Sequence, residues 1–263
     1  MFVVFALAAV IWSLVVIRAS LSTRRRGPRS ILIASGIAVA VTAASIAVDV
    51  HSMRLVLRAQ RSNLTVRIVR QDDWWQLEYA RDGMSVTTAN ELHVPAGTAV
   101  SLSWSGLPPP WIGGAVCLPD GDDRCTLVAE SADEASFIRL WPPMWRRLPI
   151  VSEPRPHFEA WLRNEALPAR RSANGEAALF ASAGCGYCHV VRGAIASASR
   201  LGPDLTHFAA RRTIAATGLP NRRGFLTGWV VHSGALKRGS LMPDNRLDPP
   251  VLRGVIAYLE SLR

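Results

Sequence analysis

The amino-acid sequence predicts a membrane-anchored protein of several parts: a transmembrane helical hairpin, a β-barrel or β-sandwich, and an all-α domain. Uncharged apolar runs lie near the N-terminus, period-two alternation marks the middle, and apolar residues recur at helical spacing near the C-terminus. We expect the hairpin at residues 1–50, the β domain at 58–152, a linker with a short helix at 153–172, and the all-α domain at 173–263.

Composition points to a membrane part and away from nucleic acid. Hydrophobic residues make up 49% of the 263 residues and charged residues only 19%, which is apolar for a soluble protein. The formal net charge is +10, yet Lys237 is the only lysine among 30 basic residues. That bias is typical of codon composition, and no basic stripe is interleaved with aromatic residues. We therefore expect no nucleic-acid partner.

The two apolar runs, residues 2–17 and 31–48, contain no charged residue. Each is close to the roughly 20 residues that span a bilayer. Arginines crowd the loop between them, which the positive-inside rule keeps in the cytoplasm. We therefore expect two spans in a bacterial inner (cell) membrane, with the soluble domains on the periplasmic side. A cleaved signal peptide at residues 1–20 is the alternative, but its positive charge would precede the apolar run.

The middle of the chain reads as β-structure. Residues 64–71 and 99–105 alternate apolar and polar side chains, and segments rich in proline, glycine and aspartate separate such runs. Cys117 and Cys125 bracket an expected hairpin tip. A disulfide is favoured there in an oxidising compartment. A copper site is the alternative, and it would need further ligands.

Three segments of the chain resemble subunit II of cytochrome c oxidases. They are D-D-W-W-Q-L-E-Y at 72–79, A-N-E-L-H-V-P-A-G at 89–97 and F-E-A-W-L at 158–162. That family has a two-helix hairpin followed by a cupredoxin β-barrel. The resemblance therefore implies a cupredoxin-type fold for the middle domain and a place in a haem-copper oxidase-type respiratory complex.

The chain departs from that family at the metal site. The family's binuclear copper centre takes C-x-x-x-C-x-x-x-H-x-x-M, whereas residues 137–149 here contain Met144 but no cysteine or histidine. Thiolates and imidazoles hold such copper, so we expect a barrel without copper. Asp73 stands where the family often has the first of three tryptophans. Electron entry at that position and a plain core role for Trp74 and Trp75 are therefore both left open.

The C-terminal part contains C-G-Y-C-H, the attachment signature of haem c. The thiols of Cys185 and Cys188 can add to the two vinyl groups of one haem, and His189 is then held where its imidazole can bind the iron. A redox dithiol is an alternative that would need a βαβ setting. A zinc site is another, for which His207 and His232 are candidate ligands without a familiar spacing.

Met242, the only methionine after this motif, is the predicted second axial ligand. It precedes a proline in S-L-M-P-D, which suits a thioether held in a loop. A His/Met pair fills both axial positions of the iron. A core methionine at a loop edge is the alternative. We therefore predict one covalent haem c, with His189 and Met242 as the metal ligands.

This domain resembles class I cytochromes c. In that family the proline carbonyl of a segment like G-P-D-L (202–205) accepts the proton of the axial histidine's other nitrogen, a part that Pro203 would play. The last helix of the family packs across the first, which makes Phe180 and Tyr258 core candidates near the crossing.

Two further segments, 211–221 and 236–243, resemble the cytochrome domains fused to some oxidase second subunits. Arg211 and Arg212 lie in the first of these segments. They either pair with haem propionates or are solvated surface charges.

An iron with both axial sites filled has no open position for a substrate, so we expect electron transfer and no catalysis by the chain alone. The resemblance implies three partners: the catalytic subunit of a haem-copper oxidase or of the related nitric oxide reductases, a soluble electron donor, and membrane lipid. Three alternatives stay open. They are a structural or assembly subunit, a carrier for another membrane complex such as a quinol-linked one, and a haem sensor or peroxidase.

Overall fold

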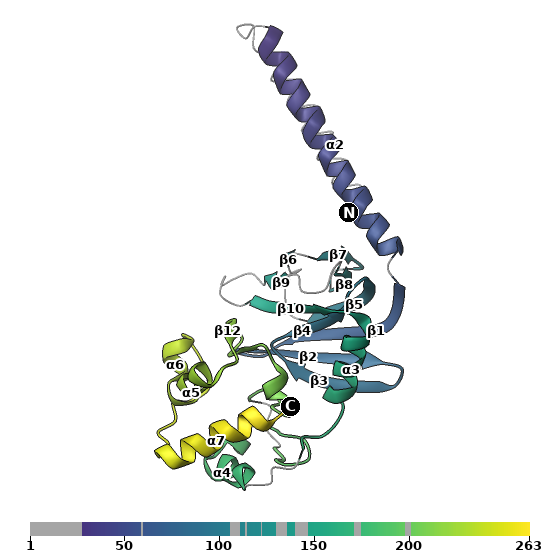
Figure 1. Cartoon of the computed structure of the whole chain (residues 1–263). Coiled ribbons are helices and arrows are strands. Elements are labelled where there is room, and N and C mark those ends of the chain that lie inside the picture. The colour runs from purple at the N-terminus through teal and green to yellow at the C-terminus, as the bar shows by residue number, and fades with distance from the viewer. Residues whose placement is uncertain are drawn as a thin grey trace. The chain divides into compact units, whose positions relative to one another are not determined.

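The computed structural model divides the chain into two compact units, Met1–Arg58 and Ala59–Arg263 (Figure 1). The structure describes residues 28–58, 60–105, 111–113, 115–121, 123–129, 136–139, 147–170, 175–197 and 201–263.

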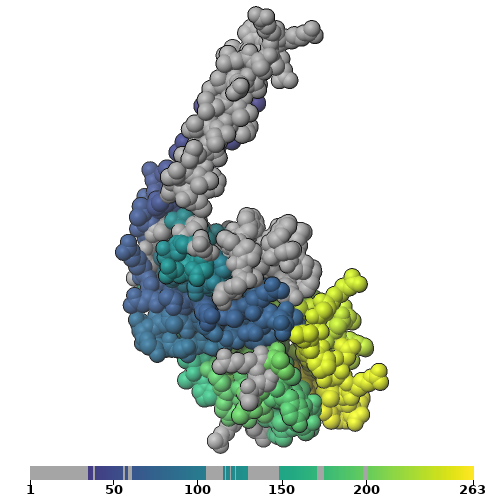
Figure 2. All heavy atoms as spheres, turned by 180° about the vertical axis from the view of Figure 1, so that it is seen from behind, coloured from purple at the N-terminus to yellow at the C-terminus, as the bar shows by residue number. Residues whose placement is uncertain are grey.

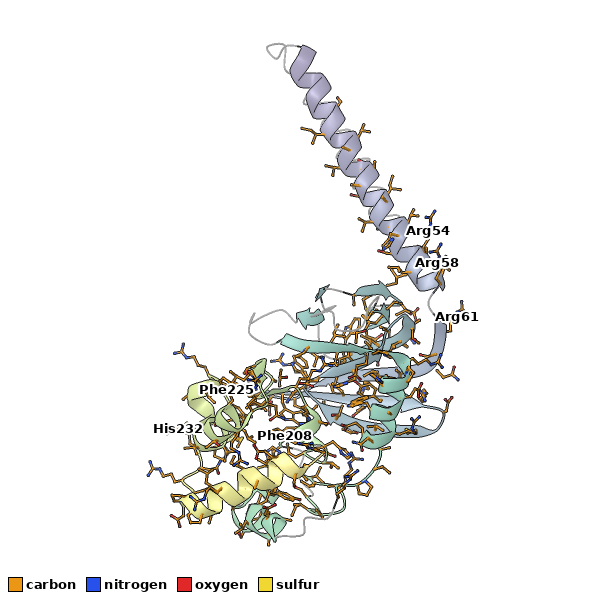
Figure 3. The ribbon with its side chains drawn as sticks, viewed as in Figure 1. Arg54, Arg58, Arg61, Phe208, Phe225 and His232 are labelled. Atoms are coloured by element: carbon orange, nitrogen blue, oxygen red, sulfur yellow. A yellow bond between two sulfur atoms is a disulfide. The ribbon has the colours of Figure 1, made fainter. Side chains whose placement is uncertain are left out.

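The described part of the first unit is one long helix, α2 (Pro28–Arg58). Its segment Ser35–Leu55 is the one described stretch that is long and apolar enough to cross a membrane, with a mean hydropathy of 1.5 over its most apolar window. Apolar side chains such as Val39 lie exposed along it. Arg54 and Arg58 project from its last turns (Figure 3), where the helix continues past the predicted end of the hairpin. The other predicted span, residues 2–17, lies outside the described residues.

The second unit begins with two β-sheets. Among the described residues, one sheet has the strand order β3-β2-β1-β5-β8-β7 and the other β4-β10-β9-β6. The pairs β1–β5 and β4–β10 are parallel, and the other neighbours are antiparallel. The strands are β1 (Gln60–Arg70), β2 (Trp75–Arg81), β3 (Met84–Ala89), β4 (Leu92–Pro95), β5 (Thr98–Ser105), β6 (Trp111–Gly113), β7 (Val116–Pro119), β8 (Arg124–Val128), β9 (Ser136–Arg139) and β10 (Arg147–Glu153).

Alternation along the strands builds the core between these sheets. In β1 the side chains of Leu64, Val66 and Ile68 are buried while Thr65 and Arg67 are exposed, because successive side chains of a strand point to opposite faces. The same apolar cluster takes in buried residues of the second sheet. This sheet-rich arrangement is compatible with the β-sandwich that the alternation predicts.

Helix α3 (Arg155–Glu165) lies in the segment expected to be a linker. Its Phe158 is fully buried and Leu162 is nearly so, and both belong to the core of the β domain. The helix therefore completes this domain as well as leading out of it.

Cys117 and Cys125 form a disulfide between β7 and β8, with their Cα atoms 5.7 Å apart. This is the outcome that their place at a hairpin favours. Within the described ranges, no group of three or more histidine, cysteine, aspartate or glutamate side chains is arranged to hold a metal ion. Met144 lies outside those ranges, so a barrel without copper stays a prediction.

The C-terminal domain is built of short helices around an apolar cluster. Buried Phe180 and Tyr258 lie 5.3 Å apart between ring centroids, as the predicted core pair near the helix crossing. A short ladder, β11–β12, departs from the all-α prediction, and positive φ at Ala215 and Ala216 forms its turn. The elements are α4 (Glu176–Ser182), η1 (Cys185–Tyr187), η2 (Phe208–Ala210), β11 (Thr213–Ile214), β12 (Leu219–Pro220), α5 (Arg223–Val231), α6 (Ser233–Leu236) and α7 (Pro249–Ser261).

The C-terminal domain lies directly against the β domain within the second unit (Figure 2). Hydrogen bonds join residues more than one hundred positions apart, such as Trp74 with Leu201 and Glu91 with Thr213.

Candidate cofactor site

A cavity of about 450 Å³ opens in the C-terminal domain. Its wall is mostly apolar, and the predicted site residues Cys185, Cys188, His189, Pro203 and Met242 all line it. The apolar side chains on the wall include Phe180, Leu205, Phe208, Ile214, Leu226, Trp229, Val230, Val255 and Leu259. An apolar cavity with a few convergent polar groups is the usual form of a cofactor site.

The ring of His189 is oriented by the backbone of Pro203. Its Nδ1 lies 2.9 Å from the Pro203 carbonyl oxygen. A carbonyl only accepts, so Nδ1 carries the proton and Nε2 keeps its lone pair. Burial lowers the pKa of His189 by more than the Pro203 contact raises it. The imidazole is therefore neutral, which is the form that binds metals.

Gly202 allows the loop to lie close to this ring. A Cβ atom at position 202 would be 2.4 Å from Cε1 of His189, so no other residue fits there without a shift. The amide of Gly202 donates to the carbonyl of Cys188 over 3.1 Å, and the amide of Leu205 donates to that of Val190 over 2.9 Å. These bonds hold the 202–205 loop against the C-x-x-C-H motif.

The two cysteines of the motif are free thiols. A tight turn carries them, in which the amides of Cys188 and His189 donate to the carbonyl of Cys185 over 3.2 and 3.0 Å. The turn begins after Gly184, whose φ of 81° is a conformation that favours glycine. Burial raises the pKa of the Cys185 thiol. Both thiols and the histidine thus reach one cavity.

The histidines proposed as alternative zinc ligands are engaged elsewhere. His207 is buried. Its Nε2 lies 3.0 Å from the Leu167 carbonyl oxygen, and its Nδ1 lies 3.3 Å from the side-chain nitrogen Nδ2 of Asn164. His232 lies on the surface, 3.0 Å from Asp244. The structure brings neither of them into the cavity wall.

Met242 reaches the cavity from a loop held by polar contacts. Its amide donates to Ser240 Oγ over 3.2 Å, and its carbonyl accepts from the hydroxyl of Ser233. The side chain is half-buried and packs against the domain core. A residue far along the chain from His189 therefore lies on the wall of the same cavity.

Arg211 distinguishes this cavity from a plain apolar one. Its side chain is buried and lines the cavity, and it donates to the Asp204 carbonyl, yet its Nε has no hydrogen-bond partner among the described residues. A buried donor left without a partner is costly. A carboxylate entering with a cofactor, such as a haem propionate, would supply one. Arg212 lies outside the wall and pairs with Glu153 at 3.6 Å.

Residues of the β domain also reach this cavity, which the sequence pattern did not predict. Asp73, Trp74 and Asn90 line it together with Lys237. The sequence signal that could have indicated this contact was the tryptophan segment at 72–79. Its resemblance to oxidase subunit II placed it in the β domain and gave no link to the C-terminal domain.

Paired free thiols, an adjacent neutral histidine and an apolar cavity define a site for a covalently attached haem, so the residues present fit haem c. The comparison with protein families agrees: residues 172–263 match the model described as Cytochrome c. The C-terminal part is therefore a cytochrome c domain, which carries covalently bound haem c for electron transfer. No curated protein matches the chain.

Proposed function

We propose that the protein is the electron-delivery subunit of a haem-copper oxidase-type respiratory complex. It passes electrons from a soluble donor through one haem c toward the catalytic subunit. One observation carries the proposal: His189 and Met242 lie on the wall of the cavity that also holds both thiols of the motif.

In this proposal each site residue has one role. Cys185 and Cys188 would bind the haem covalently, and Nε2 of His189 and the sulfur of Met242 would hold its iron, while the Pro203 carbonyl orients the imidazole. A haem ligated in this way supplies reversible one-electron chemistry. With both residues bound, the iron would have no open position for a substrate, so we propose that catalysis takes place in a partner subunit.

The membrane part of the proposal rests on the first unit and on the arginine-rich loop. The exposed apolar side chains of α2 are costly in water and suit lipid. Residues 2–17 would form the second span of a hairpin in a bacterial inner membrane, with the second unit on the periplasmic side. The anchor then holds the haem near a partner embedded in the bilayer. The cupredoxin-type nature of the barrel rests on the segments that resemble oxidase subunit II.

The first test is spectroscopy of the full chain, made in membranes together with a haem-attachment system. We expect the sharp reduced bands of haem c, no binding of carbon monoxide, and loss of covalent haem in C185A/C188A. The matched control is C117S/C125S, which removes the cysteines of the barrel and should keep the haem. Met242→Leu should open the iron to carbon monoxide, whereas Met84→Leu in strand β3 should not. Rapid carbon monoxide or peroxide binding by the unchanged protein would favour the sensor or peroxidase alternative.

The second test is purification of the native complex with metal analysis. Recovery with a haem-copper catalytic subunit, and with iron but no copper in this chain, would support the proposal. Recovery with a nitric oxide reductase-like or quinol-linked enzyme would assign the carrier to another complex. Turnover that survives Met242→Leu would indicate a structural subunit.

A further inference from the structure

Asp73, in the segment that leads into strand β2, contacts the loop that carries Met242. Its carboxylate accepts a hydrogen bond over 3.1 Å from the amide of Leu241, the residue before Met242. Lys237 pairs with the same carboxylate at 3.5 Å and also donates to the Asp73 carbonyl. Lys237 is buried although its charge is expensive to desolvate. The pair thus joins the β domain to residues 237–241, which lead to Met242.

The next residue, Trp74, contacts the loop on the histidine side. Its indole Nε1 donates to the carbonyl of Leu201 over 3.1 Å, and the side chain is only 7% exposed. Leu201 precedes Gly202, which packs on the His189 ring, and Pro203, whose carbonyl accepts from that ring. Trp74 thus holds Leu201, the residue before the 202–205 loop that lies against His189.

We propose that Asp73 and Trp74 are positioning residues for the haem iron, and that together they set the separation of its two axial-ligand loops. The inference rests on the proposed ligand roles of His189 and Met242. It gives the β domain a part in the haem site that requires no copper in the barrel.

The surroundings explain why such a clamp is needed. The side chains of Leu201 and Leu241 are 70% and 62% exposed, so these two side chains add little packing to the bonds that hold Gly202 and Met242. Loops on a surface move unless other contacts hold them. A bond between haem iron and the thioether of Met242 would be weaker than the bond to the imidazole of His189. The thioether bond would therefore depend more strongly on the position of the loop that carries Met242. A rigid strand start that contacts both loops restricts that movement.

The test compares the full-length haem protein with Asp73→Ala and Trp74→Phe. The readouts are the long-wavelength absorption band that methionine ligation gives to oxidised haem, the reduction potential, carbon monoxide binding to the reduced protein, and hydrogen exchange at the Leu241 amide. For Asp73→Ala we expect a weakened band, a lower potential, carbon monoxide binding where the unchanged protein shows none, and exchange faster by roughly tenfold, as befits loss of one hydrogen bond to a charged group. Trp74→Phe should lower the potential while leaving exchange at Leu241 close to normal.

Matched controls separate positioning from general damage. Asp72→Ala removes the exposed neighbouring carboxylate, and Trp161→Phe alters a tryptophan of helix α3 that packs against the barrel core outside the cavity wall. Both should keep the band and the potential. If Asp73→Ala does not fold, D73A/K237M removes the buried charge of Lys237 as well, and Asp73→Asn retains an acceptor for Leu241. We expect the band weakened in the double variant and largely kept in Asp73→Asn.

Two different failures are distinguishable. If the unchanged protein lacks the methionine band, the proposed ligation is wrong. If it has the band, and Asp73→Ala and Trp74→Phe keep the band and the potential unchanged, the ligation stands and the clamp is wrong.

Discussion

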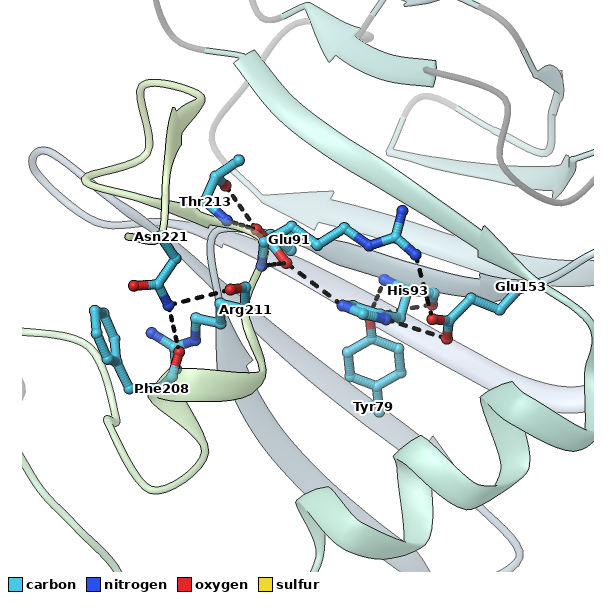
Figure 4. A network of polar contacts seen from close by, with 9 residues as sticks. Tyr79, Glu91, His93, Glu153, Phe208, Arg211, Thr213 and Asn221 are labelled. Atoms are coloured by element: carbon cyan, nitrogen blue, oxygen red, sulfur yellow. Dashed lines mark hydrogen bonds and ion pairs between the residues drawn. The ribbon is translucent and has the colours of Figure 1, made fainter. Parts of the chain in front are cut away.

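The carboxylate of Glu91 in the β domain accepts hydrogen bonds from both the amide and the hydroxyl of Thr213 in the cytochrome domain, over 2.5 and 2.6 Å (Figure 4). The amide of Arg212 donates to the same carboxylate over 3.0 Å. Burial alone would raise the pKa of Glu91, but these donors and His93 outweigh it and lower the pKa. A charged, almost fully buried carboxylate therefore joins the two domains.

Glu91→Gln should weaken this junction. The amide keeps the shape but removes the charge and places a donor opposite other donors, so we expect a loss of about 3 kcal/mol in the free energy of unfolding, the lower part of the range for a broken buried pair. Glu78→Gln is the control, because Glu78 pairs with Arg67 on the surface of the same domain and should cost under about 1 kcal/mol. Urea unfolding of both variants measures the difference. Equal losses would mean that Glu91 has no special role.

The pH dependence of His93 gives a second prediction. Burial by itself lowers its pKa, but the carboxylates of Glu153 and Glu91, 3.4 and 3.6 Å from its ring nitrogens, outweigh burial and raise the pKa above 6.5. A histidine whose pKa rises on folding adds stability that is fully present below the unfolded value and is lost as pH rises through the folded value.

We therefore expect the stability difference between the protein and His93→Gln to be greatest below about pH 6.5 and to shrink above the raised pKa of His93. Urea unfolding at a series of pH values measures it. The groups that face His93 include both carboxylates, the hydroxyl of Tyr79 at its backbone, and Trp161, which stacks on its ring. In a Glu153→Gln background the pH dependence should weaken. A difference that grows with pH would contradict the prediction.

Gly202→Ala should disturb the histidine side of the haem site. The added Cβ would lie 2.4 Å from Cε1 and 2.6 Å from Nδ1 of His189, so the ring must leave its position beside the Pro203 carbonyl. We expect destabilisation of about 1–3 kcal/mol, as for other overpacked sites, and less haem bound per chain. Gly224→Ala is the control, because a Cβ there meets nothing within 4 Å and alanine suits helix α5. Haem content and unfolding of both variants provide the comparison, and normal haem content in Gly202→Ala would refute it.

Gly254→Ala should displace the side chain of Leu179 where helices α4 and α7 cross. A Cβ at position 254 would lie 2.4 Å from Cδ1 of Leu179 across the crossing. Because only the end of a half-buried leucine must move, the expected cost is about 1 kcal/mol, the low end for overpacking, measured by thermal or urea unfolding. Leu179→Ala removes the clashing atom, so the double variant should be less destabilised than the sum of the single variants. Simple additivity would show that the two residues do not meet as described.

Short-range patterns in the sequence were enough to predict the local chemistry of this protein. C-x-x-C-H, G-P-D-L, the single late methionine and the period-two alternation of β1 are short-range patterns whose consequences follow from covalent spacing, and the structure places the corresponding side chains around one cavity or in one core. The order of the parts along the chain was equally readable, although α3 proved to belong to the β domain core.

The contacts between the β domain and the cytochrome domain could not be predicted from the sequence. Asp73 and Lys237, Trp74 and Leu201, and Glu91 and Thr213 are each separated by more than one hundred residues. No periodicity links such positions, because their contact depends on how two complete domains pack. Arg211 is buried on the wall of the haem cavity, and its Nε has no hydrogen-bond partner among the described residues; sequence alone left it undecided between a haem contact and a solvated charge.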